Sequence, residues 1–106
     1  MQLDPLPPAR YLIYLARAYG VLGRSDAAIE LLTEVLERSP NNLYAHIGLT
    51  AAYSASGLEE EARNQAQELI RLDPTFSLDQ YAEMVPIKDK AELERHIAGL
   101  RKAGLK

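Results

Sequence analysis

The chain of 106 residues contains no cysteine and no tryptophan. Without cysteine it forms neither disulfides nor thiolate metal sites, and a reducing compartment, the cytoplasm, is the simplest assignment. No apolar run approaches the roughly 18 residues that suggest a membrane-spanning helix. Acidic residues outnumber basic ones by 15 to 12, whereas nucleic-acid binding calls for a clustered basic excess. The sequence therefore predicts neither a nucleic-acid partner nor a membrane partner.

What the chain does contain is an internal repeat. Pro40 and Pro74 lie 34 residues apart (74 − 40), and a shift by this distance aligns the sequence with itself without a gap. The matched pairs include Ile13 with Ile47, Leu15 with Leu49, Ala18 with Ala52, Tyr19 with Tyr53, Gly23 with Gly57 and Ala28 with Ala62. Most of these residues have a packing role, and such a period is the signature of a repeat architecture.

Each copy predicts two helices separated by a glycine. The first helix of the first copy has one apolar face with i, i+3, i+4, i+7 spacing, made of Leu12, Leu15, Ala16 and Tyr19. Gly23 then supplies a turn, Ser25 is expected to cap the second helix, and Pro40 follows its last turn. The second copy repeats this plan around Gly57, and residues 59–61 are all glutamate at the start of its second helix.

The residues of both copies form a known signature. The first copy has Leu12-x-x-Leu15-Ala16-x-x-Tyr19, Ala28-x-x-x-Leu32 and Pro40, and the second has Leu49-Thr50-x-x-Tyr53, Ala62-x-x-x-Ala66 and Pro74. This pattern resembles the tetratricopeptide repeat, which has a period of about 34 residues. Leu12 and His46 stand where the family usually has tryptophan, and Ala66 replaces a large aromatic residue. The resemblance implies an all-α superhelix of two helix-turn-helix repeats, residues 9–42 and 43–76.

The resemblance also implies a function, because the first helices of such repeats line a concave groove that binds a protein or peptide. The groove positions in this chain are Arg10, Ile13, Arg17, Val21, Tyr44, Ile47, Ala51 and Ser54. Arg10 and Arg17 share a helical face and fit either carboxylates of an acidic peptide or ordinary solvated arginines. Tyr44 fits either an aromatic anchor or packing at the rim. The lysine and asparagine clamp of chaperone co-factors does not match these positions.

Few residues of the sequence suggest catalysis. His46 and His96 lie on different elements, and neither belongs to an arrangement of nucleophile, base and orienting group. His46 fills a repeat position and is predicted to pack, whereas His96 is predicted to face solvent or to contact Glu92 one turn earlier. The glutamates at 59–61 splay around the helix axis and are not expected to hold a cation. The sequence therefore predicts no enzyme activity, no metal and no cofactor.

Residues 77–106 lie beyond the repeats and predict two more helices. Ser77 and Gln80 form a capping box for a short helix that is expected to stop before Pro86. A last helix follows Asp89 and carries Leu93, Ile97 and Leu100 on one face. We expect this last helix to cap the apolar flank left open by the second repeat, since the ends of helical repeat arrays need a polar outer face.

The beginning of the chain predicts an unpartnered surface. Residues 1–8 form a lead-in whose Leu3-Asp4-Pro5 echoes Leu72-Asp73-Pro74, which favours a preceding repeat and a longer parent protein. The first helix would then expose a flank around Tyr11, Leu12 and Leu15. Repeats of this kind usually need about three copies for stability. Homodimerisation through this flank is therefore the alternative function.

The tail carries a second resemblance. Its segments Asp73-Pro74-Thr75-Phe76-Ser77-Leu78, Pro86-Ile87-Lys88-Asp89 and Leu100-Arg101-Lys102-Ala103-Gly104-Leu105 are similar to the ends of certain bacterial proteins. Those proteins join a class III adenylate or guanylate cyclase-like domain, or another signalling domain, to C-terminal tetratricopeptide repeats. The resemblance implies a regulatory or recruiting module of a larger bacterial signalling protein, with the cyclase residues outside this chain.

Overall fold

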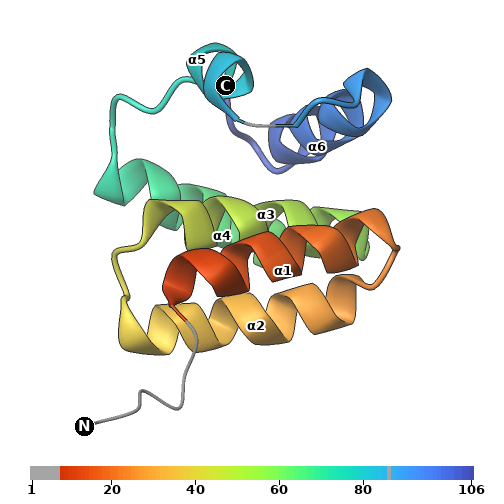
Figure 1. Cartoon of the computed structure of the whole chain (residues 1–106). Coiled ribbons are helices and arrows are strands. Elements are labelled where there is room, and N and C mark those ends of the chain that lie inside the picture. Colours follow the sequence, from red (N-terminus) through yellow and green to blue (C-terminus); the bar gives the residue numbers. More distant parts are fainter. Residues whose placement is uncertain (1–7, 86) are drawn as a thin grey trace, which may run out of the picture.

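The computed structural model describes residues 8–85 and 87–106, and within these ranges the regular structure is entirely helical. The helices are α1 (Ala9–Val21), α2 (Ser25–Arg38), α3 (Leu43–Ala55), α4 (Glu59–Leu72), α5 (Leu78–Met84) and α6 (Lys90–Lys102). The α1–α2 and α3–α4 hairpins stack side by side, and α5 and α6 lie over the second hairpin (Figure 1). The predicted all-α class of paired helices is confirmed.

The two hairpins repeat with the period found in the sequence. Adding 34 to the bounds of α1 and α2 gives the bounds of α3 and α4. Gly23 and Gly57 follow the first helix of each hairpin with φ angles of 79° and 78°, a conformation that glycine adopts without a steric penalty. The N–H of Arg24 closes the first turn by donating to the carbonyl oxygen of Tyr19 at 2.8 Å, and the second hairpin has the equivalent bond at 2.9 Å.

This turn also decides where the second helices begin. Arg24 occupies the cap position of α2, its side chain accepts no helix N–H, and Ser25 is already the first helical residue. The predicted cap at Ser25 is therefore wrong, because the bond that closes the turn places the preceding residue at the helix boundary. A side-chain cap is present at α3 instead, where Asn42 Oδ1 accepts the N–H of Ala45 at 3.1 Å.

A first core joins the first hairpin to α3. It comprises Leu12, Ala16, Ala28, Leu32, Val35, Ala45, Leu49 and Ala52. Leu12 is only 4% exposed because it faces α2 and α3 inside this core, so its predicted place in a free flank is wrong. Tyr11, by contrast, is 56% exposed, and Leu15 is half-buried. Of the three residues predicted for this flank, Tyr11 and Leu15 therefore remain accessible on the surface of α1.

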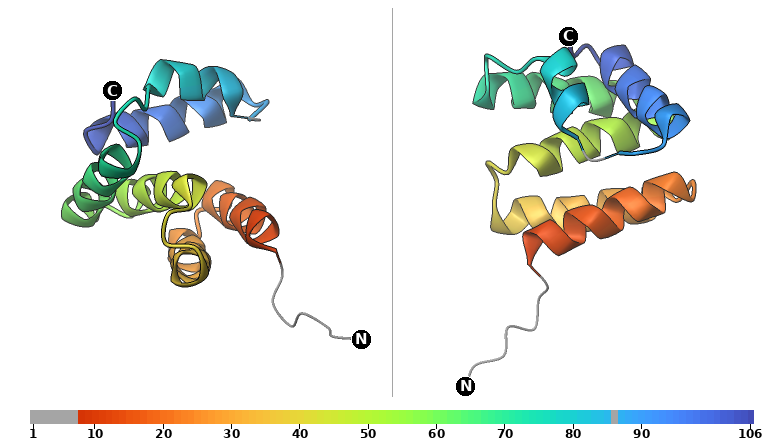
Figure 2. Two further views of the ribbon diagram at one scale, coloured as in Figure 1. Left: turned by 90° about the vertical axis from the view of Figure 1, so that its left-hand side faces the viewer. Right: turned by 45° about the horizontal axis from the view of Figure 1, so that its top comes forward.

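A second core joins the second hairpin to the tail. It comprises Ile47, Ala62, Ala66, Leu69, Leu78, Leu100, Ala103 and Leu105. The chain end is tied into this layer, since the N–H of Leu78 donates to the carbonyl oxygen of Lys106 at 2.8 Å. Ser77 caps α5 and Asp89 caps α6, as their spacing predicts. Helix α6 passes over α3, and the tail covers the apolar side of the second hairpin (Figure 2).

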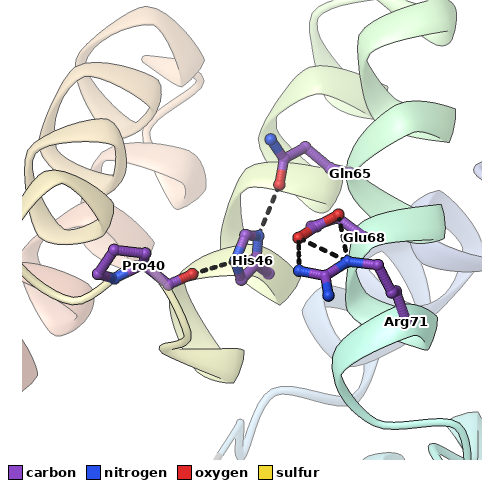
Figure 3. Close-up of polar contacts among 5 residues, drawn as sticks. All are labelled: Pro40, His46, Gln65, Glu68 and Arg71. Atoms are coloured by element: carbon purple, nitrogen blue, oxygen red, sulfur yellow. Dashed lines mark hydrogen bonds and ion pairs between the residues drawn. The ribbon is translucent and has the colours of Figure 1, made fainter.

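His46 replaces an aromatic repeat residue with a buried hydrogen-bonding one. Its Nε2–H donates to the carbonyl oxygen of Pro40 at 2.8 Å, and Nδ1 lies 2.8 Å from Gln65 Oε1 (Figure 3). Close to it, Glu68 and Arg71 form an exposed ion pair on α4. His46 thus joins the loop after α2 to α4, and its predicted packing role is confirmed.

Part of the predicted N-terminal lead-in, residues 1–7, lies outside the described residues, as does Pro86. Pro8 is described and occupies the cap position of α1. None of the helices in the described ranges is long and apolar enough to cross a membrane.

Candidate functional site

A groove lies between α1 on one side and α5 and α6 on the other, with α3 as its floor. Figure 2 shows the arrangement of these helices. At one end the groove forms a pocket of about 410 Å³, here called the arginine pocket, lined by Arg10, Ile13, Tyr14, Arg17, Asn42, Tyr44, Tyr81, Met84 and Val85. It continues along α3 as a second hollow of about 470 Å³. Both parts share Arg17 and Tyr44, so they form one continuous surface.

The structure brings most of the predicted groove residues together. Arg10, Ile13, Arg17 and Tyr44 line the arginine pocket, and Val21, Ala51 and Ser54 line the second hollow. The exception is Ile47, which is 5% exposed and belongs to the second core. It is buried because α6 passes over this part of α3, and its assignment to a partner-binding surface is wrong.

Helix α6 also narrows the groove beside Ile47. Gly99 faces Ser54 of α3, and an added Cβ would lie 3.5 Å from the serine Oγ. Ala51 is half-buried and packs against the second core. The open groove therefore lies mainly over the first repeat, next to α1.

Helix α5 supplies a wall of the arginine pocket that sequence reasoning missed. Tyr81, Met84 and Val85 face α1 across the pocket. The 34-residue register ends at Pro74, so no periodic pattern places α5 opposite α1. The capping box at Ser77 predicted the helix but not the surface that it would contact.

The arginine pocket combines positive charge with apolar and aromatic walls. Among the residues that the structure describes, no acidic side chain lines it, and neither Arg10 nor Arg17 forms an ion pair with another of them. The guanidinium carbon of Arg17 lies 5.9 Å from the centre of the Tyr14 ring, within the range of a cation–π contact. Such a pocket suits a ligand that carries a carboxylate beside an apolar group.

A polar pair connects the two tail helices beside the groove. Tyr81 Oη and His96 Nε2 lie 2.8 Å apart. Burial raises the pKa of Tyr81 to about 12, against the opposing positive charge of Arg17. Burial lowers the pKa of His96 to about 4, and Arg17 adds to this effect. Both groups are therefore uncharged at neutral pH, and they contribute polarity but no charge to the groove.

The position of His96 corrects a sequence expectation. The ring is half-buried between α5 and α6 and bonds to Tyr81, rather than facing solvent or pairing with Glu92. The reason is that α6 folds back against α5, a contact between two elements that the local sequence pattern does not specify.

The glutamates that begin α4 lie at the protein surface. Glu59 Oε1 forms an exposed ion pair with Lys102 Nζ of α6 at 3.2 Å. Within residues 8–85 and 87–106, no group of three or more histidine, aspartate or glutamate side chains is arranged to hold a metal ion. The groove is thus the surface of the described chain with the clearest binding features.

The family model for the tetratricopeptide repeat matches residues 22–84, which is 63 of the 106 residues (84 − 22 + 1). The chain belongs to the tetratricopeptide repeat family. The matched region begins at Leu22, directly after α1, and ends with α5, and the 34-residue register extends the repeat to α1. No curated protein matches the chain. Tetratricopeptide repeats typically act as scaffolds that bind proteins or peptides, and a groove along first helices is a suitable surface for this role.

Proposed function

We propose that this chain is a non-catalytic tetratricopeptide scaffold that binds an acidic, partly apolar segment of a partner protein in its groove. The observation that carries the proposal is the arginine pocket, which Arg10 and Arg17 line and which no acidic side chain of residues 8–85 and 87–106 lines. Charge-assisted hydrogen bonds to carboxylates contribute about 1.5 to 3 kcal/mol each. The guanidinium group binds carboxylates in a bidentate geometry, which also fixes the orientation of the bound segment.

The remaining walls support an apolar part of the ligand. Ile13, Met84 and Val85 offer aliphatic surface, and Tyr44 and Tyr81 offer aromatic rings with polar ends. Aromatic side chains are enriched at the centres of interfaces because they bury a large area at a small entropic cost. We therefore expect the preferred segment to place a bulky apolar residue next to an aspartate or glutamate.

A selection from a random peptide library displayed on phage tests this function. Peptides selected on the immobilised 106-residue chain should be enriched in acidic residues beside apolar ones, and fluorescence polarisation then measures their affinity. The double variant Arg10→Glu/Arg17→Glu should bind the selected peptides at least about tenfold more weakly. In this variant each attractive pair of an arginine and a peptide carboxylate is replaced by two carboxylates that repel each other. Affinity should also fall as salt is raised.

A matched control has the same change of charge elsewhere. Arg63 on α4 and Arg101 on α6 are exposed and line neither part of the groove. The Arg63→Glu/Arg101→Glu variant should keep the wild-type affinity. Equal losses in both double variants, or selected peptides without acidic residues, would contradict the proposed site.

We also infer a cellular setting for this scaffold. The similarity of the tail to the ends of bacterial signalling proteins supports a role as the C-terminal part of a larger bacterial signalling or regulatory protein. The absence of cysteine supports a cytoplasmic location. The gene that encodes the parent protein tests this setting, since a signalling domain upstream of the repeats is expected and an unrelated neighbour would argue against it.

A second candidate function is self-association. Among the described residues, six large apolar side chains have more than half of their surface exposed, and four of them lie on or directly after α1: Tyr11, Tyr14, Val21 and Leu22. Tyr14 and Val21 also line the groove, whereas Tyr11 and Leu22 do not. Clustered exposed apolar residues are typical of protein contact surfaces. This observation favours a contact between two copies of the chain through α1, in addition to peptide binding in the groove.

A further inference from the structure

An apolar stripe runs along the side of α1 that faces away from the hydrophobic core. Tyr11, Leu15, Ala18 and Leu22 follow one another at intervals of four, three and four residues, which places them on one helical face. Tyr11 and Leu22 are 56% and 73% exposed. The stripe contains no charged residue, although charged side chains normally occupy the solvent face of a helix. We call this surface the outer stripe.

The equivalent residues of the second hairpin are covered by a neighbouring hairpin. A shift by 34 residues places Tyr11, Leu15 and Ala18 on Ala45, Leu49 and Ala52. These three α3 residues are buried in the first core, where α3 packs against the first hairpin. The outer stripe is therefore the register equivalent of an interface that this chain already uses.

Next to the outer stripe, one position of α1 differs from the equivalent interface of α3 in a way that affects packing. Gly48 of α3 packs so closely on α2 that a Cβ would lie 2.9 Å from Leu32 Cδ1. The residue at the same register in α1 is Tyr14. A helix that approached α1 as α2 approaches α3 would meet the tyrosine side chain instead of a glycine. The stripe thus favours a partner that packs at a wider spacing than a further repeat of this type.

The opposite end of the molecule limits how copies can assemble. Leu78, Leu100 and Leu105 of the tail cover the apolar side of the second hairpin, and all three are almost completely buried. Within the described residues, the apolar side of the second hairpin is therefore already covered and is not available for head-to-tail stacking of copies. A contact between two identical patches closes on itself, as in the commonest kind of homo-oligomer.

We propose that the outer stripe is the twofold interface of a homodimer in which α1 packs antiparallel to α1 of a second copy. This inference rests on the second candidate function and specifies its surface and symmetry. The antiparallel arrangement places Tyr11 of each copy near Leu22 of the other and Leu15 near Ala18. At the centre of this contact the large Leu15 of each copy meets the small Ala18 of the other, and Tyr11 packs against Leu22 at both ends, which fits the wider spacing. The interface is one helix wide, so we expect a micromolar dissociation constant.

Size-exclusion chromatography with multi-angle light scattering on the 106-residue chain tests the surface. At high micromolar concentration the mass should be close to twice the 11.8 kDa of one chain. Ala18→Glu should return the mass to that of a monomer, because it places a carboxylate of each copy in the apolar contact. Ala91→Glu is the matched control on an exposed position of α6 and should leave the dimer intact. Circular dichroism should show that both variants have the same helix content as the wild type.

The outcomes separate the surface from the function. A monomeric wild type at every concentration would overturn both self-association and this interface. A dimer that persists in the Ala18→Glu variant would leave self-association in place and overturn the outer stripe as its surface.

Cross-linking tests the direction of the two helices, since the chain has no cysteine of its own. A mixture of Tyr11→Cys and Leu22→Cys chains should form mixed dimers with a short bis-maleimide reagent. Either chain alone should react poorly, because residues with the same number lie at opposite ends of an antiparallel pair. Efficient reaction of Tyr11→Cys with itself would overturn the antiparallel arrangement.

Discussion

The two hairpins share a register, yet the same register positions serve different purposes in each. Ile13 of α1 and Ile47 of α3 are identical residues 34 positions apart. Ile13 is half-buried and lines the open groove, whereas Ile47 is 5% exposed and lies in the second core. The difference comes from α6, which passes over the groove face of α3 and leaves that of α1 open.

A second pair of equivalent positions follows the same rule. Arg17 on α1 borders open space, and its equivalent on α3 is Ala51, a small residue that fits under the tail. Local sequence therefore determines that a helix forms and which face is apolar, whereas the neighbours determine whether a given face becomes a core or a binding surface. Comparing the exposed fractions of residues 34 positions apart therefore separates the effect of local sequence from the effect of neighbouring helices.

The largest expected effect comes from truncating the two isoleucines. Ile47→Ala should lower the free energy of unfolding by about 3 kcal/mol, because it leaves a cavity in the second core. Ile13→Ala should lower it by about 1 kcal/mol, because solvent already reaches that side chain. The chemical change and the change in helix propensity are the same in both variants, so they cancel. Urea denaturation followed by circular dichroism measures both values, and equal losses would refute the assignment of α6 as the cover of α3.

The cover itself should respond to pH through His96. Its pKa is about 4 in the folded chain against 6.5 for a free histidine, because burial disfavours the charged ring. Between these values the unfolded chain binds a proton that the folded chain does not. The contribution of His96 is therefore complete above about pH 6.5 and decreases as the pH falls toward 4. The total loss should be about 2 kcal/mol, since the ring keeps some contact with solvent.

His96→Gln isolates this contribution from the titration of other groups. Glutamine cannot gain the proton, yet it can still bond to Tyr81. The difference in unfolding free energy between wild type and variant, measured by urea denaturation, should change between pH 6.5 and 4. Parallel curves over that range would show that the histidine is not buried as described.

Sequence reasoning predicted the local features of this fold more fully than the tertiary ones. The capping residues Ser77 and Asp89 act within three residues of themselves, so their helices were predicted where they occur. The 34-residue period likewise fixed the two hairpins. The sequence predicts that the last helix covers the second repeat, but not that it passes over the groove face of α3, because that path depends on contacts between residues far apart in sequence. The contact of α6 with α3 explains the lost groove position at Ile47, and the contact of α6 with α5 explains the unexpected partner of His96.

The smallest expected effect concerns the glycine turns, which should behave alike in the two hairpins. Gly23 and Gly57 adopt the same left-handed conformation, and an added Cβ would meet no atom within 4 Å at either position. Replacement by alanine should therefore lower stability by about 1 kcal/mol in each case, from backbone strain alone. Gly20→Ala, within α1 and also free of contacts, should instead raise stability by about 0.5 to 1 kcal/mol. Thermal unfolding measures all three variants, and a Gly57→Ala loss several times that of Gly23→Ala would mean that the tail constrains the second turn, so that even this local feature depends on its neighbours.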